Sequence, residues 1–166
     1  RVAALAQKLR ERGIEVMTIS GGSTGTAQIK AEDGIYTELQ AGSYLFMDST
    51  YDHLDVPFGN ALFVLATVVS RSDDAVILDA GVKGLGADQN PPVILDQDGI
   101  RVTGRYVLDE EHLKLYESSW KPSAGEKVRI IPGHCCSTVN LYDRIYLCRG
   151  DAVEDRIPVT ARGRSQ

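Results

Sequence analysis

The chain has only one helix, two strands and a glycine loop of α/β-type sequence before the pattern becomes β-rich at about residue 56. Apolar residues recur at helical spacing across residues 2–9, and residues 14–19 are apolar on both faces, as a buried parallel strand is. A glycine loop at residues 21–26 follows, and a second strand is expected at residues 43–48. Helix, strand, glycine loop and strand is the order found in a βα barrel or a doubly wound sheet.

These elements cannot close a barrel, which needs eight βα units and about 250 residues. The chain has 166 residues and begins inside the predicted helix without a methionine. We therefore expect residues 1–55 to be the C-terminal portion of a βα barrel from a longer protein. The alternative is that a partner chain supplies the rest of the barrel.

Residues 56–166 are predicted to form a mostly antiparallel β domain. Strands at residues 61–70 and 75–79 are joined by turn-forming residues, and Asp96-Gln97-Asp98-Gly99 and Arg149-Gly150-Asp151 are typical of two further hairpins. A short helix is expected at residues 110–117. The remaining strands are expected at residues 93–95, 100–107, 127–131, 144–149 and 152–159. The predicted fold class is thus an α/β fragment followed by a mostly antiparallel β domain.

Composition excludes several classes of function. Hydrophobic residues make up 43% and charged residues 25%, the balance of a soluble globular protein. Lys plus Arg is 18 against 23 for Asp plus Glu, a net charge of −5, so neither a nucleic-acid nor an anionic-membrane partner is expected. The longest apolar run, residues 61–69, is about half of a membrane span, and the start does not resemble a signal peptide. Three cysteines, two of them adjacent, argue against a disulfide framework and favour the reducing cytoplasm.

The glycine loop, Gly21-Gly22-Ser23-Thr24-Gly25-Thr26, is the first candidate site. Successive backbone N–H groups after a buried strand form a concavity that suits a phosphate, and the hydroxyl groups add donors. The loop lacks both the Gly-Lys-Ser/Thr ending of a P-loop and the glycine spacing of a dinucleotide-binding fingerprint. The alternative is a tight turn in which glycine is needed for positive φ.

The second candidate is the segment Pro132-Gly133-His134-Cys135-Cys136-Ser137-Thr138. In an extended segment residues two apart point to the same side, so His134 and Cys136 can meet one ion while Cys135 faces the other way. Imidazole and thiolate suit zinc, and two protein ligands leave positions for water, substrate or a distant third ligand. A structural zinc site needs four ligands and the chain has no Cys-x-x-Cys pair, so simple packing is the alternative.

Other reactive side chains are expected to be structural or solvated. Cys148 lies inside a predicted strand and is expected in the core. His53 and His112 have polar neighbours and are expected to be solvated. Asp79 and Lys83 follow a strand end, where binding residues are common, although a turn with a solvated lysine is the simpler interpretation.

Five segments together resemble the metal-activated pyridoxal phosphate enzymes of the D-serine dehydratase and D-threonine aldolase type. These enzymes look like alanine racemases in fold, with a barrel followed by a β domain. Each segment alone is weakly specific, but the series follows the family's order across nearly the whole chain. The segments are Ser20-Gly21-Gly22-Ser23-Thr24-Gly25-Thr26, Glu38-Leu39-Gln40-Ala41-Gly42-Ser43-Tyr44-Leu45-Phe46-Met47-Asp48, Thr67-Val68-Val69-Ser70-Arg71, Asp79-Ala80-Gly81-Val82-Lys83 and His134-Cys135-Cys136-Ser137-Thr138-Val139-Asn140-Leu141.

The resemblance implies a role for each residue of the glycine loop. Gly22, Ser23 and Thr24 would bind the phosphate of pyridoxal phosphate, and Gly21 and Gly25 would shape the turn. The cofactor then serves as an electron sink for a carbanion at the substrate's Cα.

The resemblance also implies that His134 and Cys136 are the two metal ligands. In the dehydratase branch the second ligand is Cys and the ion is zinc, whereas in the aldolase branch it is typically Asp and the ion is often manganese. Cys136 therefore favours a zinc-dependent, dehydratase-like enzyme. Ser137-Thr138 stands where both branches usually have Pro-Thr, which leaves the branch open. The ion binds the substrate's β-hydroxyl and either helps it leave as water or lowers its pKa so that the Cα–Cβ bond breaks.

The family's Schiff-base lysine lies on the first barrel strand, which this chain does not contain. We therefore predict that the chain alone cannot catalyse the reaction. The lysines that are present match no such motif: Lys8, Lys30, Lys83, Lys114, Lys121 and Lys127.

The implied substrate is a small D-β-hydroxy amino acid, and a homodimer is expected by analogy, since the family's β domain commonly faces the partner's barrel. A non-catalytic module that binds phosphate or metal is the alternative from another class, followed by a purely structural β domain. An amino-acid racemase is the alternative among enzymes, and it would not need His134 or Cys136.

Overall fold

The structure of the protein is a computed structural model that describes residues 1–164, and it divides into two compact units. One unit comprises residues 1–45 and 53–59, and the other comprises residues 46–52 together with the chain from residue 60 onward. Among the residues described, no helix has both the length and the apolar character to cross a membrane. The boundary at residue 55, which concerns likeness to a barrel, stays a prediction.

The first unit contains two helices, α1 (Val2–Glu11) and α2 (Ala27–Glu32), and a 3-10 helix, η1 (Thr24–Thr26). Its only strands are β1 (Ser20–Gly21) and β2 (Glu38–Leu39), which pair in parallel. The α/β character of the fragment is therefore confirmed.

The long strand expected at residues 14–19 is wrong, because the regular pairing begins only at Ser20. Ile14 is 51% exposed and Met17 is 78% exposed. A strand that is apolar on both faces needs paired strands and covering layers around it. Within the described residues β2 is the only strand that pairs there, so the apolar run stays irregular and solvated.

The strand expected at residues 43–48 is also wrong. This stretch contains a 3-10 helix, η2 (Ser43–Leu45), and a second one, η3 (Ser49–Tyr51), follows it. Between them Met47 has a φ of 54°, which breaks the extended conformation. The Asp48 side chain then caps the N–H of Thr50, so local hydrogen bonds replace a strand ladder.

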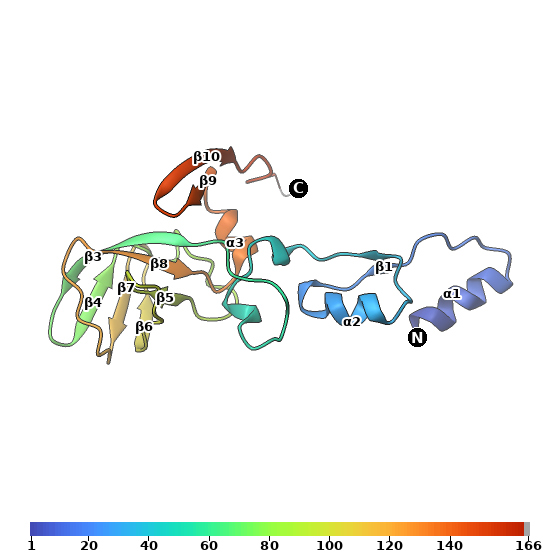
Figure 1. Cartoon of the computed structure of the whole chain (residues 1–166), viewed down its shortest axis with the longest axis horizontal. Coiled ribbons are helices and arrows are strands. Elements are labelled where there is room, and N and C mark those ends of the chain that lie inside the picture. The colour runs from blue at the N-terminus through green and yellow to red at the C-terminus, as the bar shows by residue number, and fades with distance from the viewer. Residues whose placement is uncertain (165–166) are drawn as a thin grey trace. The chain divides into compact units, whose positions relative to one another are not determined.

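The second unit is built on one six-stranded sheet in the order β5-β8-β3-β4-β7-β6 (Figure 1). Every neighbouring pair in this sheet is antiparallel, which confirms the predicted β domain. The strands are β3 (Val64–Arg71), β4 (Ala75–Leu78), β5 (Val93–Leu95), β6 (Arg105–Leu108), β7 (Leu113–Tyr116) and β8 (Lys127–Ile131).

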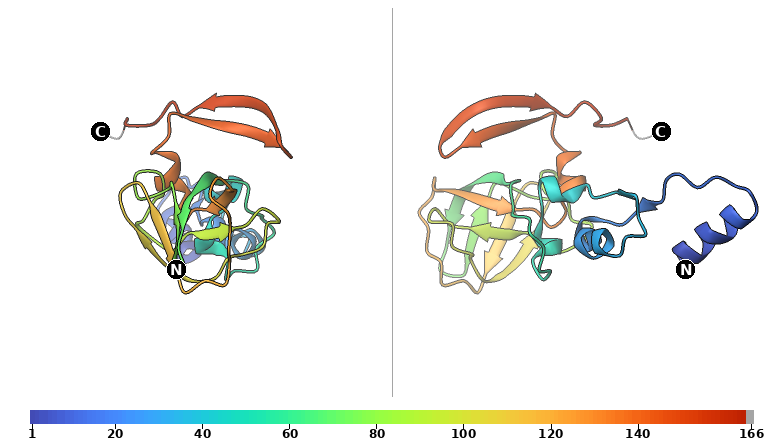
Figure 2. Two further views of the ribbon diagram at one scale, coloured as in Figure 1. Left: turned by 90° about the vertical axis from the view of Figure 1, so that its left-hand side faces the viewer. Right: turned by 45° about the vertical axis from the view of Figure 1, so that its right-hand side comes forward.

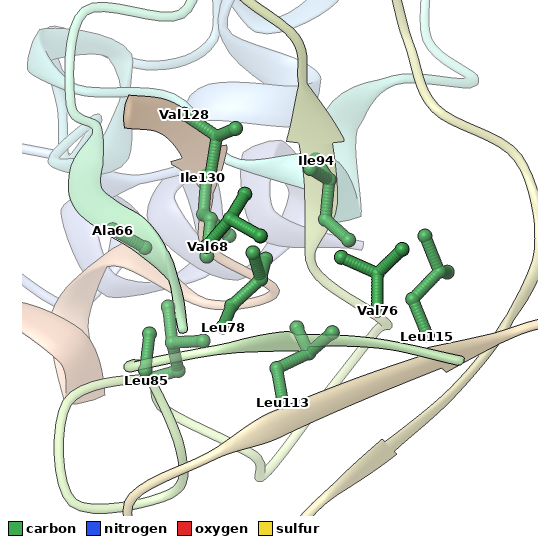
Figure 3. Packing of buried hydrophobic residues seen from close by; sticks show 11 residues of the cluster. Ala66, Val68, Val76, Leu78, Leu85, Ile94, Leu113, Leu115, Val128 and Ile130 are labelled. Atoms are coloured by element: carbon green, nitrogen blue, oxygen red, sulfur yellow. The ribbon is translucent and has the colours of Figure 1, made fainter. Parts of the chain in front are cut away.

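Alternate residues of the sheet face one core. Ala66 and Val68 on β3 are each 1% exposed, and Val128 and Ile130 on β8 are buried beside them. Figure 3 shows these side chains converging with those of the facing strands. The cluster is completed by Val76, Leu78, Ala80, Leu85, Ile94, Leu113 and Leu115. Period-two burial of this kind is what drives a half-buried sheet to form.

The helix expected at residues 110–117 is wrong, because β7 occupies that stretch. Leu113 and Leu115 are buried while Lys114 between them is not, and β7 pairs with β4 on one side and β6 on the other. The burial of alternate residues thus overrides the local helical tendency.

The last two strands, β9 (Arg144–Arg149) and β10 (Ala152–Pro158), pair only with each other in the described part of the chain (Figure 2). The hairpin predicted at Arg149-Gly150-Asp151 is confirmed. Every residue of β10 is exposed, and so is Cys148 on β9. The prediction that Cys148 is a core residue is therefore wrong, because a two-stranded ribbon has no second layer to cover it.

Candidate functional site

The segment predicted to bind metal lies where β8 leads into a short helix, α3 (Cys135–Val139). His134 caps this helix in an extended conformation, with φ −146° and ψ 116°. The side chain of His134 is 22% exposed, Cys135 is buried and Cys136 is exposed. The segment is extended only as far as His134, so a helix rather than a strand gives this outward, inward, outward pattern.

A buried carboxylate fixes the start of this helix. Asp48 is 1% exposed, and its Oδ2 accepts a hydrogen bond of 2.7 Å from the backbone N–H of Cys135. Its Oδ1 accepts the N–H of Thr50 at 3.1 Å. The hydroxyl of Thr50 donates in turn to the carbonyl oxygen of Gly133 at 2.8 Å. Residues 46–52 therefore hold the segment directly before and after His134.

A second carboxylate, Asp88, holds the imidazole of His134. The Nδ1 of His134 lies 2.6 Å from Oδ2 of Asp88, and the hydroxyl of Ser137 donates to Oδ1 of the same carboxylate at 2.5 Å. The Ser137 hydrogen bond and, after it, the His134 hydrogen bond hold the pKa of the Asp88 carboxyl below its usual value. With Nδ1 bound to Asp88, Nε2 is the imidazole nitrogen that remains for a metal ion.

The donor chemistry of His134 and Cys136 fits a divalent metal. An outward imidazole and an exposed thiol in one short segment are ligands that zinc prefers. Across residues 1–164 no group of three or more His, Cys, Asp or Glu side chains is placed to hold an ion. Two protein ligands would therefore have to be completed by water or substrate.

The predicted phosphate loop lies in the other unit, between β1 and α2. Gly22 has a φ of +82°, and a Cβ at Gly21 would lie 2.7 Å from the ring of Tyr36. Position 22 therefore favours glycine for its left-handed turn, and at Gly21 a larger residue would have to displace the Tyr36 ring. The turn-shaping alternative accordingly accounts for these two glycines without a ligand.

The remaining loop residues form the first turn of η1. Ser23 is the N-cap, with its N–H donating to the Thr26 hydroxyl at 3.0 Å, and Thr24 is buried with its hydroxyl oxygen accepting from the N–H of Tyr44 at 3.0 Å. The first N–H groups of a helical turn, here those of Thr24 and Gly25, have no acceptor within the helix. Two such N–H groups and the hydrogen of the Thr24 hydroxyl are donors that suit a phosphate.

Asp79 and Lys83, the third candidate, have structural partners. Oδ1 of Asp79 accepts the N–H of Thr67 at 2.6 Å, across the β3–β4 pair. Lys83 forms ion pairs of 3.0 Å with Glu110 and Glu111, and these carboxylates, Glu110 first, raise the pKa of Lys83. His53 and His112 are exposed, in line with the expectation that they are solvated.

Sequence reasoning missed Asp48, Asp88 and Ser137 as site residues. Asp48 ends an apolar run, which is a visible signal, because a charged residue directly after buried residues needs a partner. Asp88 lies in a polar loop that looks like any solvated turn, and no local pattern distinguishes it.

Comparisons with known proteins identify the family of the chain. A family model described as "Putative serine dehydratase domain" matches residues 61–148, which include all of the six-stranded sheet and the His134–Cys136 segment. The chain belongs to this serine dehydratase domain family. A D-threonine aldolase from Arthrobacter sp is 44% identical to this chain over an alignment of 171 positions. The alignment covers 99% of this chain and 44% of that protein.

Three further comparisons are consistent with this, two with the family and one with the fold alone. A D-threo-3-hydroxyaspartate dehydratase from Delftia sp. is 32% identical, covering 80% of this chain and 41% of that protein. The crystal structure of a D-threonine aldolase from Filomicrobium marinum superposes with a TM-score of 0.87 at 37% identity, covering 98% of this chain and 46% of that chain. An alanine racemase-like protein from Idiomarina loihiensis shares the fold, with a TM-score of 0.80 at 22% identity, 92% of this chain and 46% of that one. The chain thus spans less than half the length of each of these four relatives, and its alanine racemase-like fold is confirmed.

Proposed function

We propose that the chain is part of a lyase that acts on D-β-hydroxy amino acids and depends on pyridoxal phosphate and a divalent metal. The observation that carries the proposal is the outward pair His134 and Cys136, with the imidazole held through Nδ1 by Asp88. Family membership and the names of the aldolase and dehydratase relatives support the same reaction class.

Each unit contributes one binding task. In the first unit Gly22, Ser23 and Thr24 would hold the cofactor phosphate. In the second unit His134 and Cys136 would hold the metal, with zinc favoured by the thiolate and manganese as the alternative. When bound, pyridoxal phosphate supplies an electron sink at Cα and the metal supplies a Lewis acid at the β-hydroxyl.

Two observations bear on the choice between dehydratase and aldolase, and they differ. Cys136 favours the dehydratase branch, whereas the relative at 44% identity is named an aldolase. The products distinguish the two reactions, because D-threonine gives glycine and acetaldehyde by Cα–Cβ cleavage but 2-oxobutanoate and ammonia by loss of water. The measurement requires a protein that includes the Schiff-base lysine, and we expect no turnover from residues 1–166 alone.

Metal analysis of the purified chain tests the proposal directly. We expect about one zinc per chain, lost on treatment with a chelator and lost in both His134→Ala and Cys136→Ala. Cys148→Ala is the matched control, since it removes another exposed thiol from a strand of the same unit and should leave the zinc content unchanged. A well-folded chain that holds no zinc or manganese would contradict the metal-dependent lyase and favour the racemase or the non-catalytic module.

A further inference from the structure

We propose that Asp88 is a positioning residue that orients His134 for metal binding, and that Ser137 and the loop around Gly86 hold Asp88 in place. This inference rests on the proposed function, because it concerns the same metal site. Asp88 itself need not touch the ion or the substrate.

The two oxygens of the Asp88 carboxylate contact two different residues of the first turn of α3. Oδ2 lies 2.6 Å from Nδ1 of His134, at the N-cap, and Oδ1 accepts the hydroxyl of Ser137, three residues later. The Ser137 hydroxyl also lies 3.4 Å from the carbonyl oxygen of His134. A carboxylate held at both oxygens cannot rotate freely, so it fixes the plane in which the imidazole must lie.

The loop that carries Asp88 is docked closely on α3 and the residues before it. A Cβ at Gly86 would lie 2.0 Å from Oγ of Ser137, and a Cβ at Gly133 would lie 1.8 Å from the carbonyl oxygen of Asn90. The N–H of Gly86 donates to the hydroxyl of Thr138 at 3.0 Å. The Gly133 approach is to backbone and the Gly86 approach is to the Ser137 side chain, so a Cβ at either position would displace the loop or the serine that holds Asp88.

This geometry selects one tautomer of His134. A carboxylate accepts a hydrogen bond from the N–H at Nδ1, which leaves the lone pair of Nε2 for an ion. Solvated imidazole prefers the opposite tautomer, with the proton on Nε2, so a change of tautomer on losing Asp88 is directly observable. Because the Asp88 side chain is 50% exposed and lies outside the core, its loss removes orientation but little stability.

The experiment measures zinc affinity and the His134 tautomer in the same chain. Long-range ¹H–¹⁵N NMR of the metal-free wild type should show the Nδ1–H tautomer, and Asp88→Ala should shift it toward Nε2–H. Zinc affinity should fall about 10- to 100-fold in Asp88→Ala, the range seen when a ligand's hydrogen-bond partner is removed. Asp88→Asn should recover part of both signals, because its amide oxygen still accepts a hydrogen bond.

Asp151→Ala is the matched control, because it removes the same charge from an exposed turn of the same unit. Neither the tautomer nor zinc affinity should change in it, and Trp120 fluorescence should verify the fold of every variant. If the wild type binds zinc and Asp88→Ala binds it equally well, the positioning role is refuted while the proposed function stands. If the wild type binds neither zinc nor manganese, the proposed function fails and the positioning role fails with it.

Discussion

Replacing Asp48 should loosen the start of α3 and destabilise the second structural unit, which contains the six-stranded sheet and is called the β unit below. This side chain is 1% exposed and accepts two backbone N–H groups, from Cys135 at 2.7 Å and from Thr50 at 3.1 Å. Asp48→Ala removes both acceptors at once. The two consequences differ in size, because the two donors lie in different surroundings.

The buried N–H of Cys135 loses its partner and gains none, which costs about 1–3 kcal/mol as an unsatisfied donor. The N–H of Thr50 lies in a partly exposed residue and can turn to water, so its loss adds about 0.5–1 kcal/mol. Removing a buried carboxylate also relieves its desolvation, which offsets part of the cost. The free energy of unfolding should therefore fall by about 2–3 kcal/mol. Asp48→Asn keeps one acceptor oxygen and should lose about half as much.

Urea unfolding followed by the fluorescence of Trp120 reports on the second structural unit, which contains Asp48. Trp120 is the only tryptophan of the chain, and it packs against the core of the sheet. With a denaturant slope of about 1.5–2 kcal/mol/M, the midpoint should shift by about 1–2 M for Asp48→Ala. Zinc affinity should fall as well, since His134 and Cys136 flank the amide that Asp48 holds.

Asp98→Ala is the control, because Asp98 is an exposed residue of a turn in the same unit and its replacement should leave the free energy of unfolding within about 0.5 kcal/mol of the wild type. A midpoint for Asp48→Ala that matches this control would refute the reasoning. It would mean that the Cys135 amide finds another acceptor and that Asp48 does not determine the start of the helix.

Two further outcomes are expected from the β unit. The N–H of Ser123 donates to Glu126 at 2.7 Å and is the main reason that the pKa of this carboxyl lies below its usual 4.5. Its stabilising contribution is therefore present above pH 4.5 and disappears as the pH falls through the lower folded value. The urea midpoints of wild type and Glu126→Gln should differ at pH 7 and approach each other as the pH falls below 4.5, and a constant gap would contradict this. Gly133→Ala should lower the free energy of unfolding by about 1–3 kcal/mol, because its Cβ would overlap the backbone carbonyl of Asn90; a urea midpoint equal to that of the wild type would contradict this.

The sheet could be predicted from the sequence where burial alternates along a strand. Ala66 and Val68, or Val128 and Ile130, are separated by one residue that faces away, and this period is visible without coordinates. The prediction failed where neighbours rather than the local pattern decide. Residues 14–19 look like a buried strand but have no sheet around them in the described chain, and residues 110–117 look helical but lie between two strands.

The candidate ligands could be named from the sequence, but the residues that hold them could not. His134 and Cys136 lie two residues apart in one short motif. By contrast, Asp88 lies 46 residues and Asp48 lies 86 residues before His134. A contact over such a separation leaves no local pattern that names the partner: Asp48 is visible only as a charged residue after an apolar run, and Asp88 reads as part of a solvated turn. Only the topology, which places β8, α3 and the two loops side by side, makes these contacts visible.

The direction in which each side chain of the motif points is set by backbone hydrogen bonding rather than by extended alternation. A helix that begins inside the protein must satisfy its first N–H groups, and here Asp48 satisfies that of Cys135 from within the fold. An amide directed to a buried acceptor keeps Cys135 in the interior, where its side chain is 1% exposed. On either side of it, the thiol of Cys136 is exposed and the His134 side chain is 22% exposed. One buried carboxylate thus accounts for the inward placement of Cys135, and the exposed carboxylate of Asp88 then determines which nitrogen of His134 can be used.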